Sequence, residues 1–349
     1  MRLARLCLLL IVALALRVSA ATPLGDVLQL AAGLAHACAL TSSGAVKCWG
    51  WNYAGQLGNG TTSDAIAAVD VAGLGAGVTS IAAGAYHTCA VVNGGVKCWG
   101  RNDGGQLGNG TTVDSAIPVD VIGIGSGASA LAAGASHSCA VVNGSAKCWG
   151  YNHTSQLGDG TDVDSLVPVQ VAGLASGVTS MTAGWGHTCA VVNGGIECWG
   201  FNFDGELGRG TATYSEPIAA AAVGLAAGAT QVVAGDYHTC AAVNAGVRCW
   251  GHNVAGQLGN GTTADTATPV PVIGLSSDAL VIAAGGSTTC AIVSGATQCW
   301  GFNGDGELGD GTTTSRDAPV AVSGLAAGAI ALAVGAYVSC AVVAGGAKC

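Results

Sequence analysis

A hairpin-forming segment with two cysteines recurs along the chain and limits what the chain can fold into. Its clearest copy is GAYHTCAVVNGGVKCWGRNDGGQLGNGTT, from Gly84 to Thr112. Asn93-Gly94 separates two alternating runs, and this indicates a two-residue β-hairpin turn, because both turn positions need positive φ. Counting outward from the turn places Cys89 opposite Cys98 at a non-hydrogen-bonded pair, where Cα atoms approach to about 4.5 Å. A disulfide tolerates that distance, so we predict one bridge within each hairpin.

The cysteine pair returns about every 50 residues, which is the signature of an array of similar supersecondary units. The predicted bridges are Cys38–Cys48, Cys89–Cys98, Cys139–Cys148, Cys189–Cys198, Cys240–Cys249, Cys290–Cys299 and Cys340–Cys349. In the first unit Ser42-Ser43-Gly44 replaces Asn-Gly, and the cysteine spacing grows by one residue. This change predicts a three-residue loop that ends in a left-handed Gly.

Each unit also has an apolar run ending in Ala-Gly before the hairpin and a run around Pro-Val after it, as in VTSIAAG and PVDV. Four short strands per unit are therefore expected. Helical spacing is absent, and 58 glycines with strand-length runs between turns exclude a helical solenoid. Four-stranded units of this size pack radially around an axis. We predict an all-β fold, a seven-bladed β-propeller that forms one domain over residues 21–349.

The last unit ends at Cys349, before any Trp-Gly or Gln-Leu-Gly. We therefore expect the seventh blade to be incomplete. Two alternatives follow for its closure. Either Ala21 to Asp26 pairs with the C-terminal strands, or the sequence is truncated and the ring is imperfectly sealed.

Two motifs recur beside the cysteines: Ala-Ala-Gly-x-x-His-Thr-x-Ala-Val at 82–91 and Trp-Gly-x-Asn-x-x-Gly-Gln-Leu-Gly-x-Gly at 99–110. They resemble the repeats of the regulator of chromosome condensation family over residues 27–349. The resemblance implies a seven-bladed propeller. The cysteine pairs depart from intracellular members, which carry apolar or small residues there, and this argues against a nuclear role. An exported protein of similar architecture, the type II β-lactamase inhibitor protein, blocks an enzyme.

Residues 1–20 have the features of a cleaved export signal. Arg2 and Arg5 precede an apolar run from Leu6 to Leu16, and Val18-Ser19-Ala20 precedes Ala21. The run is shorter than the ~20 residues that span a bilayer, and no later segment qualifies. Removal of Cys7 with the leader leaves 14 of the 15 cysteines, all paired. An oxidising compartment is expected, which makes this a secreted, periplasmic or cell-surface protein.

The charge of the chain disfavours a nucleic-acid partner. The leader holds three of the 11 basic residues, so the mature chain has 8 against 20 acidic ones, a formal charge of 8 − 20 = −12. Phosphate binding needs clustered Lys and Arg, which are missing. Gly108-Asn109-Gly110 lacks the Lys and helix of a phosphate loop, so no cofactor is expected. We expect a soluble monomer.

The other recurring residues are assigned to structure. No metal site is expected, because Cys-x-x-Cys spacing is absent and one carboxylate per loop is too few for calcium. Five histidines are predicted to hydrogen-bond the neighbouring turn. They are His36, His87, His137, His187 and His238. Six tryptophans at one repeat position are predicted to pack between blades. They are Trp49, Trp99, Trp149, Trp199, Trp250 and Trp300.

Alternating strand direction sorts the turns onto two faces. The Asn-Gly hairpins and the VAGLGAG-type links share one face and are alike in every unit. The turn after Ala-Ala-Gly and the loop after Trp-Gly-x-Asn share the other, which we call the variable face because these segments differ between units. Candidate partner-binding residues on it are Tyr53, Tyr86, Asp103, His153, Trp185, Phe203, Asp204, Asp236, Tyr237, Asp305 and Tyr337.

These observations favour an exported, non-catalytic module that binds another protein through the variable face. Inhibition of a hydrolase is the most specific form of this hypothesis. Nuclear members of the family imply a guanine-nucleotide exchange factor instead, which export and acidity oppose. A glycan-acting enzyme is the third alternative. It would use Asp103, Asp204 or Asp236, and two carboxylates about 5 to 10 Å apart would be required. An acidic pocket at the ring centre would favour the enzyme, and a broad aromatic surface would favour binding.

Overall fold

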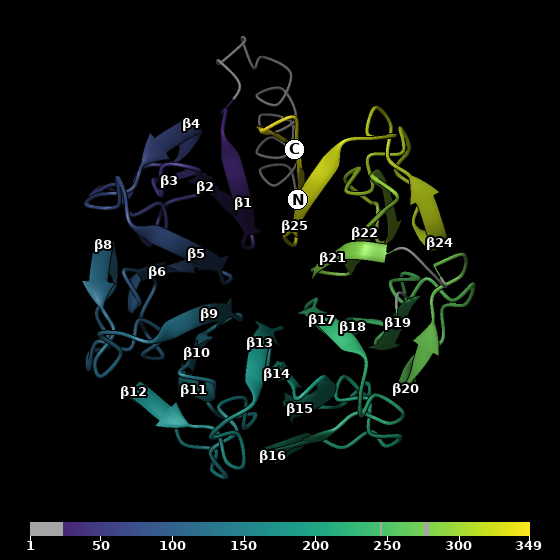
Figure 1. Cartoon of the computed structure of the whole chain (residues 1–349), viewed down its shortest axis with the longest axis horizontal. Coiled ribbons are helices and arrows are strands. Elements are labelled where there is room, and N and C mark those ends of the chain that lie inside the picture. Colours follow the sequence, from purple (N-terminus) through teal and green to yellow (C-terminus); the bar gives the residue numbers. More distant parts are fainter. Residues whose placement is uncertain (1–23, 245, 276–278) are drawn as a thin grey trace, which may run out of the picture.

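The seven repeats form seven antiparallel sheets arranged around a central axis (Figure 1). This computed structural model describes residues 24–244, 246–275 and 279–349. Six sheets have four strands and the seventh has three, which confirms the all-β, seven-bladed propeller with an incomplete last blade. In this part of the chain no helix is long and apolar enough to cross a membrane. The predicted export signal lies outside the described residues.

In each blade the strands follow chain order from the axis outward. The innermost strands are β1 (Val27–Ala32), β5 (Val78–Ala83), β9 (Ala128–Ala133), β13 (Val178–Ala183), β17 (Ala229–Ala234), β21 (Ala279–Gly285) and β25 (Ala329–Val334). The second strands are β2 (His36–Thr41), β6 (His87–Val92), β10 (His137–Val142), β14 (His187–Val192), β18 (His238–Val243), β22 (Thr288–Val293) and β26 (Ser339–Val343).

The third strands complete the hairpins, and the fourth strands form the outer rim. The third strands are β3 (Val46–Gly50), β7 (Gly95–Gly100), β11 (Ser145–Gly150), β15 (Gly195–Phe201), β19 (Gly246–Gly251), β23 (Ala296–Gly301) and β27 (Gly346–Lys348). The fourth strands are β4 (Ala65–Asp70), β8 (Ser115–Asp120), β12 (Ser165–Gln170), β16 (Ser215–Ala221), β20 (Thr266–Pro271) and β24 (Arg316–Ala321).

The hairpins have the predicted register. Cys89 lies opposite Cys98, and the turn residues Asn93 and Gly94 have φ values of 51° and 81°. All seven predicted disulfides are present, with Cα–Cα distances of 4.0 to 4.1 Å. In the first blade the three-residue loop ends at Gly44, whose φ is 78°. Local turn chemistry therefore fixes the strand pairing, and the pairing brings the cysteines together.

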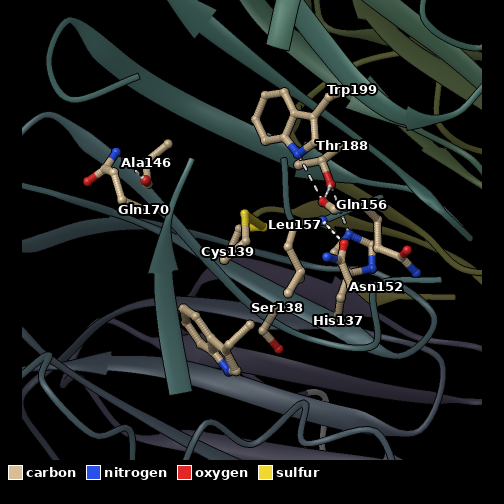
Figure 2. Close-up of a disulfide and its surroundings, with 12 residues drawn as sticks. His137, Ser138, Cys139, Ala146, Asn152, Gln156, Leu157, Gln170, Thr188 and Trp199 are labelled. Atoms are coloured by element: carbon tan, nitrogen blue, oxygen red, sulfur yellow. Dashed lines mark hydrogen bonds between the residues drawn. A yellow bond between two sulfur atoms is a disulfide. The ribbon is translucent and has the colours of Figure 1, made fainter. Parts of the chain in front are cut away.

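The same hydrogen-bonded junction recurs at five boundaries between blades, from the first blade to the sixth, and Figure 2 shows it for the third and fourth blades. The carbonyl oxygen of Gln156 accepts hydrogen bonds from Trp199 Nε1 and Thr188 Oγ1, each at 2.9 Å. His137 Nε2 lies 2.9 Å from the same Thr188 oxygen. The hydroxyl has a single hydrogen, which it gives to Gln156, so His137 donates and is the neutral Nε2–H tautomer.

This junction confirms the structural roles of the repeated Trp and His. Trp199 is fully buried, and a Cβ added to Gly158 would lie 2.6 Å from its ring, so glycine makes room for the indole. The predicted partner of the histidines was wrong, because each bonds a hydroxyl on the second strand of the next blade and not the neighbouring turn. The remaining pairs are His36–Thr88, His87–Ser138, His187–Thr239 and His238–Thr289.

The loops after the third strands are organised by a buried asparagine. Asn152 accepts a bond from Leu157 N at 2.9 Å and donates from Nδ2 to the carbonyl of Val163 at 3.1 Å. The backbone amide of Asn152 donates to the carboxylate of Asp164. Three other blades have the same bond between the equivalent asparagine and Asp64, Asp114 or Asp265. These carboxylates therefore cap the loops.

The seventh blade meets the first through a backbone hydrogen bond and a shared apolar cluster. Val27 N donates to the carbonyl of Gly345 at 2.9 Å, and Leu24 packs with the cluster that contains Val342. The sheet of this blade contains β25, β26 and β27 only. Within the described residues, Leu24 to Asp26 does not add the fourth strand that one of the two alternatives required. Residues 21–23 lie outside the described part.

Candidate functional site on the variable face

Hydrogen bonds between neighbouring segments show that the turns divide between two faces as predicted. On the variable face, Arg101 N donates to the carbonyl of Tyr86 at 2.9 Å, which ties the long loop to the first turn of its blade. On the opposite face, Ala128 N donates to the carbonyl of Gly94 at 2.9 Å, which ties the hairpin to the link into the next blade. The fold thus brings the variable segments of every blade to one side.

Five aromatic side chains gather on the variable face where the fourth and fifth blades meet. Phe201 lies at the centre, with ring centroids 5.9 Å from Tyr237, 6.0 Å from Tyr214 and 6.4 Å from Phe203. Trp185 lies 6.4 Å from Tyr237. The exposed fractions are 67% for Phe203, 66% for Tyr214 and 43% for Trp185. We call these five residues the aromatic patch.

Acidic side chains border the aromatic patch. Asp204 Oδ2 lies 3.0 Å from His252 Nδ1. Glu206 is buried where four other blades have Gln, and burial raises the pKa of this carboxyl to about 7. Burial also raises the pKa of Asp236 to about 6. The border therefore combines a histidine–carboxylate pair with two carboxyls that hold protons more strongly than usual.

One group of side chains here has metal-ligand geometry, although the sequence predicts no metal site. One ligand atom from each of Asp204, His252 and Asp265 lies within 4.8 Å of the other two. Carboxylate and imidazole are donors that divalent metals accept. The Asp265 oxygen, however, already accepts the Asn253 amide at 2.6 Å. We therefore describe the group as a polar cluster beside the aromatic patch.

The other candidate residues form separate groups. Tyr53 and Tyr86 contact each other with centroids 5.3 Å apart, and Arg101 lies 5.6 Å above the Tyr86 ring and pairs with Asp103. This group spans the first and second blades. The structure brings Trp185, Phe203, Asp204, Asp236 and Tyr237 together in and around the aromatic patch. Tyr53, Tyr86 and Asp103 lie apart from these residues, in the first and second blades.

The remaining candidates, His153, Asp305 and Tyr337, lie in other parts of the ring. His153 stacks on Tyr151 with centroids 4.6 Å apart. Asp305 and Tyr337 line a cavity of about 480 Å³ between the sixth and seventh blades. The candidate residues thus make four groups around the ring, and the aromatic patch is the largest.

Several residues of these groups were not among the candidates predicted from the sequence, although the repeat contains a pattern that identifies them. Phe201, His252, Arg101 and Tyr151 all occupy the position between Gly and Asn in Trp-Gly-x-Asn. That position varies between blades as the predicted positions do. It lies at the end of the third strand, where its backbone amide donates to a carbonyl in the turn of the same blade, as in the bond from Tyr151 N to the Ser136 carbonyl at 2.9 Å. Tyr214 precedes β16 and stands at the repeat position of the loop-capping Asp64, Asp114, Asp164 and Asp265. In this blade the backbone amide of Asn202 donates to the Tyr214 carbonyl instead, at 3.2 Å.

The central cavity has a volume of about 290 Å³ and is lined mainly by alanine and glycine of the innermost strands. Asp236 supplies the single carboxylate among the described residues that line it. Asp103 is paired with Arg101, and Asp204 with His252. The ring centre therefore lacks the two free carboxylates that the glycan-acting alternative requires.

Solved structures of several other proteins have the same fold. Human WBSCR16 superposes with a TM-score of 0.78 at 20% identity, covering 90% of this chain and 85% of that one. Prp20p of Saccharomyces cerevisiae, described with its binding to Gsp1p and histones, gives 0.78 at 20%, covering 90% and 82%. The ectodomain of the Physcomitrella patens receptor kinase CR4 gives 0.55 at 20%, covering 92% and 71%.

Sequence comparison leads to the same group of proteins. The ultraviolet-B receptor UVR8 of Arabidopsis thaliana is 42% identical over 64 residues, which is 18% of this chain and 14% of UVR8. The family model described as "RCC1-like domain" matches residues 13–342, most of the chain. The resemblance inferred from the repeats is confirmed, and the protein belongs to the RCC1-like domain family.

Proposed function

We propose that this protein is an exported, non-catalytic propeller that binds another protein through the aromatic patch. One observation carries the proposal: each of five aromatic rings from three segments lies within 6.4 Å, centroid to centroid, of another ring of the group, and three of the five are exposed. None of the five occupies the repeated tryptophan position that packs between blades. Aromatic side chains on a rigid scaffold are typical of interface centres.

The border of the patch suggests the kind of partner. Asp204 and Asp236 lie beside the aromatic rings, and the mature chain has a formal charge of 8 − 20 = −12. An apolar centre with an acidic border fits a partner surface that has apolar residues surrounded by Lys and Arg. Inhibition of a hydrolase of that kind remains the most specific form of the proposal. The seven disulfides support an extracellular or periplasmic setting.

The two alternatives have no observation in their favour. The acidic charge and the disulfides weigh against an intracellular exchange factor and against DNA binding. The alanine-lined ring centre weighs against glycan chemistry there. Protein binding is also what the description of Prp20p reports for that family member.

The test starts with affinity capture of a partner from the exported and surface fraction of the source organism. Phe203→Ala and Trp185→Ala are then each expected to weaken that partner's binding by about 2 kcal/mol or more, roughly 30-fold. Their melting temperatures should stay near that of the wild type, because exposed positions usually shift stability by less than about 0.5 kcal/mol. Phe302→Ala is the matched control, since it is an aromatic of the same face on the sixth blade.

A buried tryptophan provides the opposite control. Trp199→Ala is expected to destabilise the protein by roughly 3 to 5 kcal/mol, because it empties a contact between blades. Suppose that Phe203→Ala and Trp185→Ala lower the melting temperature as strongly as Trp199→Ala, or leave the affinity unchanged. The aromatic patch would then not be the binding surface.

A further inference from the structure

The turn after the innermost strand places one residue of each blade at the mouth of the central cavity. This residue follows the glycine that ends the Ala-Gly motif, and all seven such residues line the cavity. Two of them, Trp185 and Asp236, come from the neighbouring fourth and fifth blades. The other five carry no charge and no aromatic ring; they are Leu34, Ala85, Ala135, Gly286 and Ala336. An indole and a carboxylate therefore stand next to each other in an otherwise featureless ring.

Backbone hydrogen bonds hold these two turns in contact. Trp185 N donates to the carbonyl of Asp236 at 3.0 Å, and Asp236 N donates to the carbonyl of Gly286 at 2.9 Å. The turn of Asp236 is closed by a bond from Gly235 N to the carbonyl of His238, also at 2.9 Å. The backbone positions of both residues are thus fixed before any ligand arrives, and this lowers the entropy cost of binding.

The Asp236 carboxylate has no hydrogen-bond or ion-pair partner among the described residues, and burial raises its pKa to about 6. No lysine or arginine of the described chain lines the cavity. Apart from the Trp185 indole, the wall has three other polar side chains, and each already bonds the backbone of the next blade: Gln29, Thr182 and Gln231. A partly buried carboxylate that is ionised at neutral pH is stabilised by a nearby cation. The fold provides none here.

The surroundings of Asp236 are acidic and aromatic. Burial first, and then the negative charges of Asp236, Glu206 and Asp204, raise the pKa of Tyr237. The Tyr237 ring centroid lies 6.4 Å from that of Trp185, so these carboxylates act on the same part of the face. The face of an indole ring also attracts cations. Charge and ring therefore favour the same kind of ligand.

The first and second blades show how one arginine can serve a ring and a carboxylate together. Arg101 lies 5.6 Å from the centroid of Tyr86 and pairs with Asp103. Trp185 and Asp236 offer the same two groups without the arginine.

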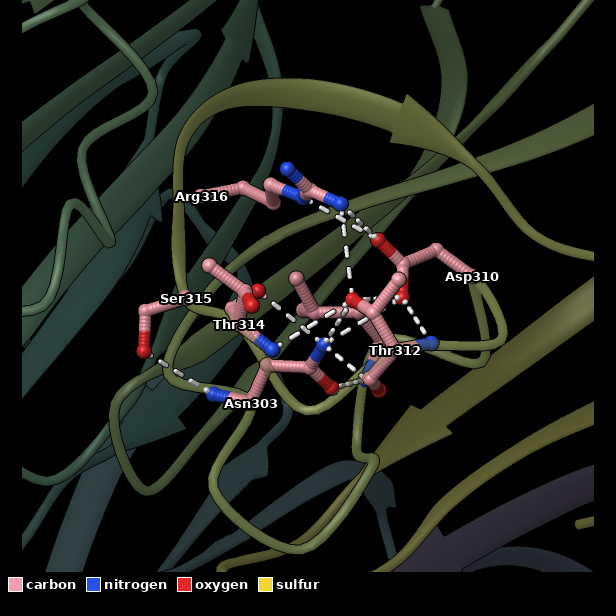
Figure 3. A network of polar contacts seen from close by, with 7 residues as sticks. Asn303, Asp310, Thr312, Thr314, Ser315 and Arg316 are labelled. Atoms are coloured by element: carbon pink, nitrogen blue, oxygen red, sulfur yellow. Dashed lines mark hydrogen bonds and ion pairs between the residues drawn. The ribbon is translucent and has the colours of Figure 1, made fainter.

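A guanidinium can also give two hydrogen bonds to one carboxylate, as the sixth blade shows (Figure 3). There Arg316 donates from Nε and Nη2 to Oδ2 of Asp310, at 3.0 and 2.8 Å. The planar guanidinium combines such bonds with stacking on a ring, which the compact ammonium group of lysine does less well. The missing cation at the cavity mouth is therefore best supplied by arginine.

We propose that the mouth of the central cavity binds the guanidinium of an arginine side chain, between the indole of Trp185 and the carboxylate of Asp236. The arginine belongs to the protein that docks on the aromatic patch, so this inference rests on the proposed function and specifies one contact of it. The stem of the side chain packs along the alanine-lined wall. The cavity volume of about 290 Å³ suits a single side chain, since ligand pockets usually have about 300 to 1,000 Å³.

The test is an NMR titration of the isotope-labelled, oxidised protein with Nα-acetyl-arginine methylamide. The readout is the indole N–H signal of Trp185, which is identified by its absence in Trp185→Phe. We expect a saturable shift with a dissociation constant on the order of 1 mM, as one side chain can provide. The citrulline derivative has the same shape without the charge and should bind at least tenfold more weakly. No saturable shift up to about 50 mM, or equal binding of the two probes, would overturn the proposal.

Free arginine distinguishes a protein side chain from a small-molecule ligand. Its α-carboxylate finds no lysine or arginine among the described residues of the cavity wall, so it should bind no more tightly than the acetylated amide. Tighter binding of free arginine would overturn the assignment to a side chain of the partner.

Variants of the protein locate the site. Asp236→Ala should weaken binding of the arginine probe at least tenfold, and it should fold, because Ala85 and Ala135 occupy this repeat position. Asp120→Asn is the matched control, since it removes a carboxylate that pairs with Lys97 on the outer rim and should leave the affinity unchanged. Melting curves check that both variants fold. If folded Asp236→Ala binds the probe as the wild type does, the site is not at the cavity mouth. If it does not fold, the comparison of the arginine and citrulline probes still decides the question.

The arginine site and the aromatic patch can fail separately. The probe contains no partner protein, so its binding does not depend on the capture of one. Once a partner is captured, loss of its affinity in Phe203→Ala but not in Asp236→Ala would remove the arginine site and keep the aromatic patch. Binding of the probe together with an unchanged partner affinity in Phe203→Ala would remove the aromatic patch instead.

Discussion

At five boundaries between blades, a single hydroxyl on the second strand of one blade bonds both a histidine and a backbone carbonyl of the preceding blade. Thr188 accepts a hydrogen bond from His137 of one blade and donates to the Gln156 carbonyl of the same blade, while its own backbone belongs to the next. Ser138 fills this place at one boundary, so the position needs the hydroxyl and not the methyl group. Because all three groups are buried, none can replace a lost partner with water.

The residue-scale prediction follows from this arrangement. Thr188→Val keeps the shape of the side chain and leaves the His137 Nε2–H buried without an acceptor, so it should lower the free energy of unfolding by about 1 to 3 kcal/mol. Thr188→Ser should have little effect. Thr112→Val is the control, since Thr112 is exposed in a loop and should change stability by less than about 0.5 kcal/mol. Denaturant unfolding measures all three, and equal effects of Thr188→Val and Thr112→Val would contradict the argument.

The hairpin is the element that the sequence predicted best. Asn93-Gly94 fixed the turn, and counting fixed the partner of every residue up to Cys98. The partners of the histidines and the grouping of the face residues were not predictable in this way. His137 bonds a residue 51 positions further along the chain, and the aromatic patch joins segments from two blades. Those contacts depend on how the blades meet around the axis, which local turn chemistry does not specify.

One hairpin has an unfavourable turn residue and gives an element-scale prediction. Ala344 has a φ of 52° where other blades have Asn, such as Asn93. A left-handed conformation costs alanine about 1 kcal/mol, and asparagine tolerates it better. Ala344→Asn should therefore raise the free energy of unfolding by roughly 0.5 to 1 kcal/mol, and Asn93→Ala should lower it by a similar amount. Urea unfolding of both variants checks the two signs. A loss of stability in Ala344→Asn would show that another contact determines this turn.

Across the whole molecule, five buried histidines around the ring make stability depend on pH. Burial lowers the pKa of His36 and His187 to about 4 and that of His87, His137 and His238 to about 3. The unfolded chain binds these protons near pH 6.5 and the folded one does not. Stability is therefore complete above pH 6.5 and falls as the pH drops toward 4.

We expect the denaturant midpoint to decrease from pH 7 to pH 5 at constant ionic strength. Each histidine contributes a slope of at most about 1.4 kcal/mol per pH unit. Glu206 and Asp236 act in the opposite direction, because their raised pKa values make the folded state bind protons more strongly, so they offset part of the loss. A midpoint that is constant or rises on acidification would contradict this account.

Every disulfide joins consecutive cysteines that are only 9 or 10 residues apart. A chain that crosses a membrane from its N-terminus presents its cysteines one after another, and each pair is complete before the next pair arrives. An oxidase that links cysteines in order of emergence would therefore form the native set directly. The native set therefore requires no pairing between distant cysteines, and each hairpin can be locked before any blade has a neighbour.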